Sequence, residues 1–366
     1  MKLLISLSLA FLLTGCAAPN TVKQIITKDS VVKYKKSDPD RFQNLYVPNK
    51  LKDKTYPVTC EKNCYPQSAL VECQHGSENC HYSGVNPKID RDFGFEITWL
   101  GHASFHIRTS SGVNVLLDPV SQQFDNPVAF AHWLTGGIYR NEPKWLSKRD
   151  VENVDAVLYS HIHYDHFNKA DIAAMPRNVE YFTPLNFADH FENDGYQINE
   201  MVWYSAANVQ DIKIDFVPAH HFSGRIIVPL IYDDFDKSLW GGWVIEGKGK
   251  KLFFAGDTGY SKHFKDIHSK YGDMDVCLMP IASYYHKEAG NWYRYVHMTP
   301  EDALVAAQDL NCKLFVPWGY GNNSWKMGDH STHSALLRLL YMHKKLGLTL
   351  PMHIINEGDV IKFNDI

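Results

Sequence analysis

The sequence lacks three features, each of which would point to a particular class of protein. No apolar run is long enough to cross a bilayer, no block of basic residues follows position 93, and no internal repeat or low-complexity tract is present. A net charge of −4 without a basic block excludes nucleic acid as the main partner. About 270 of the 366 residues follow position 93, and this length predicts one large α/β domain with a substantial core.

The first sixteen residues have the pattern of an export signal. Lys2 precedes an apolar run over residues 3–13, and small residues and Cys16 follow in the stretch "LTGC". The run is too short for a transmembrane helix and is typical of a signal that is removed. "LTGC" resembles the lipobox of bacterial lipoproteins, and a plain signal peptide with a chance cysteine is the alternative. The resemblance implies a lipid anchor on Cys16 at the periplasmic face of the cell envelope, in the outer membrane of a Gram-negative host.

Residues 17–93 are predicted to form a tether and a cysteine-rich surface arm. They show no sustained hydrophobic periodicity, and basic residues outnumber acidic ones over positions 23–54. Beside a lipid anchor this positive charge could lie on anionic headgroups, and a solvated linker is the alternative. Both interpretations place the segment on the surface.

The cysteines fall into two groups. Cys60, Cys64, Cys73 and Cys80 lie close together in the arm, where an oxidising compartment favours two disulfides. Their spacing does not give the pairing, and a zinc knuckle is the alternative. Two further cysteines lie in apolar, strand-like runs and are expected to be buried free thiols: Cys277 and Cys312.

From residue 95 onward the pattern alternates short strands with helices. A buried strand over residues 154–160 leads directly into a histidine cluster, and a helix follows over residues 168–175. Thr299 is expected to cap a helix that ends near residue 310. Further strands are predicted over residues 95–118, broken by the turn "TSSG", and over residues 211–219, 241–247, 250–256 and 274–281. This order favours sheets packed between helices.

The stretch "SHIHYDHF" places three histidines and an aspartate within six positions. His161 and His163 lie two apart on an extended segment and point the same way, while Asp165 and His166 begin the next turn. Imidazole and carboxylate groups suit Zn²⁺, so the cluster predicts a metal site at the end of a strand. Isolated histidines elsewhere are interpreted as structural: His132, His190 and His343.

This stretch resembles the HxHxDH signature of the metallo-β-lactamase superfamily. Between residues 99 and 318, further stretches resemble its phospholipase D branch, which acts on N-acylphosphatidylethanolamine: "WLGHASFHI", "LLDP", "PAHHFSGR", "FAGDTGY", "MPIASYY" and "HMTPEDA". The resemblance implies an αββα sandwich in a hydrolase domain over residues 94–366, with a site for two zinc ions between the sheets.

The resemblance also assigns the ligands. It places His161, His163 and His221 on the first metal, Asp165 and His166 on the second, and Asp257 between the two. His221 is chosen over His220 because the matching histidine falls three residues after the proline of "PAHHFSGR".

Three more residues are expected at or near the site. Asp118 would accept a hydrogen bond that orients the ligand loop, and Asp118, Asp257 and His297 are the predicted catalytic group. His297 precedes a capped helix, whose N-terminus favours anions such as a phosphate. His102 and His297 could each bind substrate phosphate, relay a proton or only support the ligands.

One position departs from the resemblance. The family has a histidine directly before Trp-Gly as the last ligand of the second metal, and this chain has Pro317 there. Proline has no side-chain donor, so the second zinc is in doubt. The candidate replacements are His286, His330 and His333.

These observations predict a zinc-dependent phosphodiesterase that acts on a membrane lipid through a hydroxide held by the metal. Two alternatives remain open: a hydrolase of the same fold acting on a lactone, amide or other ester, and a non-catalytic envelope lipoprotein. The sequence gives no oligomeric state.

Overall fold

The architecture comes from a computed structural model, which describes residues 18–46, 59–73, 80–88, 92–121, 151–192, 195–225, 233–284, 291–322 and 332–362. The export signal with Cys16 lies outside these residues, as do His132, His286 and His330. Within them, no helix has the length and apolar character needed to span a bilayer.

Eight strands form the first sheet, in the order β1-β11-β10-β9-β8-β7-β6-β18. The strands from β1 to β8 in this order run parallel, and β8, β7, β6 and β18 pair antiparallel. The predicted turn joins β7 to β8, where Gly112 N–H donates to the Thr109 carbonyl. Their bounds are β1 (Thr21–Ile25), β6 (Phe95–Gly101), β7 (Ser104–Thr109), β8 (Asn114–Leu117), β9 (Ala156–Leu158), β10 (Glu180–Pro184), β11 (Gln197–Met201) and β18 (Val360–Ile361).

Six strands form the second sheet, in the order β12-β13-β14-β15-β16-β17. The first four pair antiparallel and the last two continue in parallel. Their bounds are β12 (Ala206–Val209), β13 (Ile212–Val217), β14 (Gly242–Gly247), β15 (Lys250–Phe254), β16 (Val276–Pro280) and β17 (Leu314–Trp318).

Two helices begin at residues whose side chains cap them. Asn168 accepts hydrogen bonds from the first turn of α3 (Lys169–Ala174). Thr299 caps α5 (Pro300–Asp309) and forms a capping box with Asp302, as the sequence predicts. The remaining helical segments are α4 (His263–Tyr271), α6 (Ser334–Lys345), and the short η1 (Ala188–His190) and η2 (Asn291–Tyr295).

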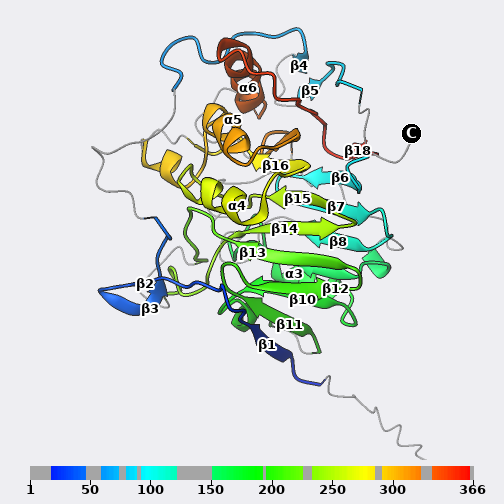
Figure 1. Cartoon of the computed structure of the whole chain (residues 1–366), viewed down its shortest axis with the longest axis vertical. Coiled ribbons are helices and arrows are strands. Elements are labelled where there is room, and N and C mark those ends of the chain that lie inside the picture. The colour runs from blue at the N-terminus through cyan, green and yellow to red at the C-terminus, as the bar shows by residue number, and fades with distance from the viewer. Residues whose placement is uncertain are drawn as a thin grey trace, which may run out of the picture.

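The two sheets pack face to face between helices. Phe254 of β15 meets Phe105 of β7 with ring centroids 6.1 Å apart, whereas its neighbour Phe253 meets Phe264 of α4 at 6.2 Å. Successive side chains of a strand point to opposite faces, so β15 lies between the other sheet and α4. Figure 1 shows the strands in two stacks, with α4 and α5 beside β14–β16.

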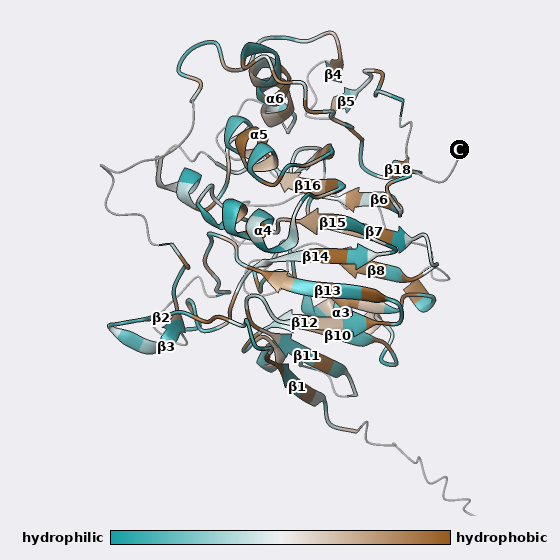
Figure 2. Cartoon of the chain, viewed as in Figure 1, coloured by the Kyte–Doolittle hydropathy of each residue, from teal (hydrophilic) through white to brown (hydrophobic). Residues whose placement is uncertain are grey.

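The outer face of the eight-stranded sheet is covered in the same way. Val115 and Leu117 of β8 belong to the cluster between the sheets, whereas Leu116 belongs to a second cluster that includes Ile172 of α3. Hydrophobic residues accordingly recur along the strands in Figure 2. The layers are helix, sheet, sheet, helix, which confirms the predicted αββα sandwich.

The N-terminal arm is more than a tether. Its strand β1 pairs in parallel with β11 and forms one edge of the large sheet. The tether prediction is therefore wrong for residues 21–25. The side chains of β1 are almost all exposed, so this strand needs no hydrophobic alternation and is held by backbone hydrogen bonds. The arm adds two hairpins, β2 (Tyr34–Lys35) with β3 (Asp38–Phe42) and β4 (Val71–Cys73) with β5 (Cys80–Tyr82).

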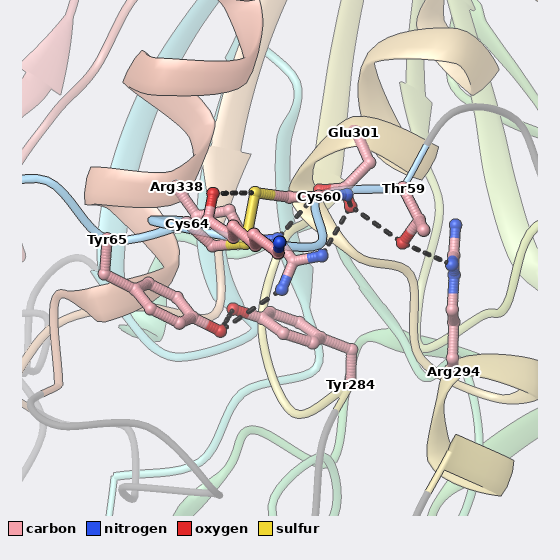
Figure 3. The surroundings of a disulfide bond; sticks show 9 residues. Thr59, Cys60, Cys64, Tyr65, Tyr284, Arg294, Glu301 and Arg338 are labelled. Atoms are coloured by element: carbon pink, nitrogen blue, oxygen red, sulfur yellow. Dashed lines mark hydrogen bonds and ion pairs between the residues drawn. A yellow bond between two sulfur atoms is a disulfide. The ribbon is translucent and has the colours of Figure 1, made fainter.

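Two disulfides form in the arm, as predicted, and the structure gives their pairing: Cys60–Cys64 and Cys73–Cys80. Figure 3 shows the first of them against α5 and α6. The backbone N–H of Cys60 donates to Glu301, whose carboxylate also accepts from Arg338 of α6. This buried network fastens the arm to the helices that flank the second sheet.

Cys277 and Cys312 are bonded to each other. The prediction of buried free thiols is therefore wrong. Cys277 lies in β16 and Cys312 precedes β17, which is its parallel neighbour, so sheet pairing brings together two cysteines 35 residues apart.

Candidate metal centre

One group of potential metal ligands lies where strands of both sheets end. His161 and His163 follow β9, His221 follows β13, and Asp257 follows β15. Each offers one ligand atom, and these atoms all lie within 4.8 Å of one another. We call these four residues the first cluster.

The histidine nitrogens of the first cluster lie within hydrogen-bond distance of one another, but the available protons cannot satisfy all of these contacts. His163 Nδ1 lies 2.8 Å from His161 Nε2 and 3.1 Å from His221 Nε2. His221 Nδ1 lies 2.9 Å from the Val296 carbonyl, which can only accept, so Nδ1 carries the proton and Nε2 presents a lone pair to the cluster. Three imidazole nitrogens converging on one point fit a metal ion better than a hydrogen-bond chain.

A second cluster lies beside the first and consists of His102, Asp165 and His166. Asp165 Oδ2 lies 2.8 Å from His102 Nε2 and 3.3 Å from His166 Nε2. Asp257 joins the clusters, because its Oδ2 lies 3.2 Å from His166 Nε2 and 3.9 Å from His221 Nε2. His166 Nε2 is buried and makes no hydrogen bond to the described residues, although it points between these carboxylates. Such an atom also fits a metal ligand.

Asp118 forms hydrogen bonds with the loop over residues 160–166, which carries three of the histidines. It follows β8, is fully buried, and accepts hydrogen bonds from the N–H and hydroxyl groups of Ser160 and from His166 Nδ1 at 2.7 Å. With its Nδ1 proton engaged, His166 presents Nε2 to the second cluster. Asp118 therefore accepts hydrogen bonds from both ends of the segment 160–166, and its role in orienting the ligands stays a prediction.

The electrostatics of the centre favour a cation. Burial lowers the pKa of His163 to about 4 and holds the pKa of His161 and His221 well below the ordinary value. These histidines are therefore neutral, which is the form that binds metal. Burial opposes charge on His166, but nearby carboxylates, Asp257 foremost, raise its pKa well above the ordinary value. The first cluster thus places three neutral imidazoles beside carboxylates, and the proton on His166 offsets part of the negative charge that a divalent cation would offset when bound.

His297 lies at the rim of the first cluster. Its Nδ1 is 3.6 Å from Asp257 Oδ2, and its ring stacks on Tyr293 with centroids 5.5 Å apart. Burial lowers the pKa of His297. The residue stands two positions before the cap of α5, and the structure places it beside the donors.

An apolar pocket of about 240 Å³ opens beside the first cluster, and His221 forms part of its wall. Its apolar lining comes from both the arm and the main domain: Phe42, Phe222, Phe235, Trp240 and Val296.

Asn44 of the arm contacts the centre in a way that sequence reasoning missed. Its side chain donates to the His221 carbonyl at 2.8 Å and accepts from the His221 N–H at 2.9 Å. Trp240 Nε1 also donates to Asn44 Oδ1, at 3.0 Å. No local sequence signal links residues 177 positions apart, so this contact is visible only in the fold.

The other singled-out histidines lie away from the donors. His333 is buried against Tyr320 and is part of neither cluster, so it does not replace the ligand missing at Pro317. His343 bonds the Leu350 carbonyl, and burial lowers the pKa of His190 to about 4, both in line with structural roles.

Residues 113–320, more than half of the chain, match the family model for the β-lactamase superfamily domain. An uncharacterised protein of Mycobacterium tuberculosis is 29% identical over 252 residues, which cover 67% of this chain and 63% of that protein. An N-acyl-phosphatidylethanolamine-hydrolyzing phospholipase D of Caenorhabditis elegans is 29% identical over 244 residues, 62% of this chain and 64% of the enzyme. The matched part thus spans a little under two thirds of these two relatives.

Two further comparisons cover nearly whole relatives. A metal-dependent hydrolase of Rubrobacter xylanophilus is 28% identical over 273 residues, 73% of this chain and 96% of that protein. The solved structure of a metallo hydrolase from Ignicoccus hospitalis matches with a TM-score of 0.52 and 22% identity, covering 73% of this chain and 97% of that chain. The structural match supports the fold.

Proposed function

The chain belongs to the metallo-β-lactamase superfamily, and from this membership we propose that it is a zinc-dependent hydrolase of phospholipase D type. The observation that carries the proposal is the pair of donor clusters joined at Asp257. Neutral imidazoles and carboxylates in this arrangement suit Zn²⁺, and seven donors around two points suit two ions.

Different residues of the centre would bind the metal and contact the substrate. Bound zinc supplies a nucleophile from water at neutral pH and stabilises negative charge on the attacked group. His161, His163 and His221 hold one side of the centre, and Asp257 fixes the spacing of the two clusters. His297 reaches the rim from the N-terminal side of α5, where it can bind a phosphate oxygen or pass a proton to the leaving oxygen.

The proposed substrate is N-acylphosphatidylethanolamine or a similar membrane lipid. Water would attack phosphorus, the bond from phosphorus to the headgroup oxygen would break, and a proton would pass to that oxygen, leaving phosphatidic acid and an N-acylethanolamine. The similarity to the phospholipase D of Caenorhabditis elegans supports this choice. The apolar pocket beside His221 supports it as well, because it can take an acyl chain next to the reacting phosphate.

We further propose that the protein works at a membrane, anchored through an acylated Cys16 on the periplasmic face of the cell envelope. The support is the "LTGC" stretch. An anchor there would keep the domain at the surface that holds its substrate.

The test is product analysis on lipid vesicles. Purified protein with zinc should convert vesicles containing N-acylphosphatidylethanolamine to phosphatidic acid and N-acylethanolamine, while an Asp257→Ala variant should not. Hydrolysis of lactones, amides or carboxylic esters with no attack on the phosphodiester would replace the phospholipase proposal by another hydrolase activity. Metal binding with no turnover of any of these would favour a non-catalytic lipoprotein.

A further inference from the structure

Pro317 leaves the second cluster without the histidine that the family resemblance places at that position. We infer that His102 is the ligand that completes the second metal site. The inference rests on the proposed metal-dependent function, but it concerns which residues bind the ion and not which substrate is cleaved.

The distances in the second cluster fit a shared ion. Ligand atoms about 2.0–2.2 Å from a tetrahedral zinc lie about 3.4 Å apart. His166 Nε2 lies 3.3 Å from Asp165 Oδ2 and 3.2 Å from Asp257 Oδ2, which is already this spacing. His102 Nε2 lies 2.8 Å from Asp165 Oδ2, so a shift of a few tenths of an ångström would bring it to the same spacing. With His102 included, four donors surround the second point.

The backbone fixes His102 in this place. It stands in the tight turn between β6 and β7 with a φ of 48°, in the left-handed region that residues with side chains seldom adopt. Its carbonyl accepts a hydrogen bond from Trp99 Nε1 at 2.8 Å. The side chain is only 5% exposed, and its ring lies edge-on to His166 at 5.8 Å. A strained turn that aims a buried imidazole at two other donors is the kind of feature found at functional sites.

The strand that carries Pro317 also packs against His102. Trp318 follows Pro317 at the end of β17, and its ring lies 6.3 Å from both His102 and His166. It also stacks on Phe254 at 5.6 Å. β17 therefore contributes a packing surface behind the two histidines, and its position 317 contributes no donor.

The competing interpretation is that His102 only donates a hydrogen bond to Asp165 and so orients that ligand. The two roles predict different results for a side chain that can still donate. Glutamine can hydrogen-bond Asp165 but is a poor zinc ligand, so His102→Gln retains the orienting contact and removes the coordinating nitrogen. His102→Asn tolerates the positive φ and serves as a second variant if the glutamine variant folds poorly.

The experiment measures bound zinc per chain after dialysis, together with the affinity of each site by competition with a chelator. Purified full chain should hold two ions, and His102→Gln and His102→Asn should hold one, with affinity at the second site reduced more than about 100-fold. Loss of an orienting residue alone typically costs 10–100-fold. His333→Ala is the matched control, because His333 is equally buried but lies outside both clusters, and it should keep two ions.

Three results would overturn the inference: a single tightly bound ion in the unaltered chain, two ions retained in His102→Gln, or loss of the second ion in His333→Ala. None of them bears on whether a phosphodiester is cleaved. Conversely, a chain that binds two ions through His102 but cleaves no lipid would leave this inference intact and refute the proposed substrate.

Discussion

Asp118 Oδ2 and His166 Nδ1 lie 2.7 Å apart in a pair that is fully buried. The carboxylate fixes which nitrogen of His166 faces the second cluster, and it also binds the Ser160 backbone at the start of the histidine loop. Burial raises the pKa of Asp118, although His166 and Ser160 oppose this effect.

We predict that Asp118→Asn weakens zinc binding at the second cluster by about 10–100-fold, the usual cost of losing a partner that orients a ligand. The asparagine amide would face the donors of His166 and Ser160 with at most one acceptor oxygen. Asp171→Asn is the control, since Asp171 is equally buried but bonds Ser121. Zinc competition titrations that leave Asp118→Asn unchanged would remove this role.

A second prediction concerns Asn44, whose side chain makes two hydrogen bonds with the backbone of His221. Asn44→Ala frees this backbone and should lower zinc affinity at the first cluster by about tenfold. Asn86→Ala is a close control, because Asn86 makes the same pair of hydrogen bonds with Ile354, outside both clusters.

Thermal unfolding and zinc affinity, measured side by side, separate the two effects. Both variants should lose stability, but only Asn44→Ala should lose metal. Equal zinc affinity in the two variants would show that the arm only braces the fold.

These contacts show where sequence reasoning succeeds. The strand that ends at Leu158, the donors of the HxHxDH stretch and the cap at Thr299 are encoded within a few residues, so local periodicity and spacing predict them. Donors brought by other strands are not encoded locally. Only the family resemblance predicts His221 and Asp257 as ligands.

The missed features all depend on long-range pairing. The exposed edge strand β1 has no hydrophobic alternation to reveal it, and Cys277 and Cys312 meet only because β16 and β17 are neighbours. The resemblance places His102 near the site, but it does not reveal the contact with Asp165, which is 63 residues away. Composition and residue spacing do not predict which strands become neighbours in a sheet.

The proposed anchor can be tested without any substrate. Because "LTGC" resembles a lipobox, Cys16→Ser should move the protein from the membrane fraction to the soluble fraction of a bacterial host. Fractionation followed by immunoblotting checks this. Unchanged membrane association in the variant would refute acylation at Cys16.

The stability of the metal-free protein should depend on pH through buried neutral histidines such as His333. Burial lowers its pKa from 6.5 to about 4, so between these values the unfolded chain binds more protons than the folded chain. The effect is absent above pH 6.5, and as the pH falls from 6.5 toward 4 the free energy of unfolding decreases by about 3 kcal/mol.

Urea unfolding at pH 7 and at pH 4.5 checks this effect. His333→Gln should lose less stability between the two pH values than the unaltered chain does. Identical pH profiles for the two proteins would contradict the assignment.

The most direct test of the account is to titrate the metal-free protein with zinc while following hydrolysis of a phosphodiester such as bis(4-nitrophenyl) phosphate. We predict no turnover without metal and a rise in rate that levels off as the clusters fill, with His163→Ala and Asp257→Ala folded but inactive at every zinc concentration. Full turnover by the metal-free protein, or by either variant, would contradict the claim that the joined clusters are the centre of a zinc-dependent hydrolase.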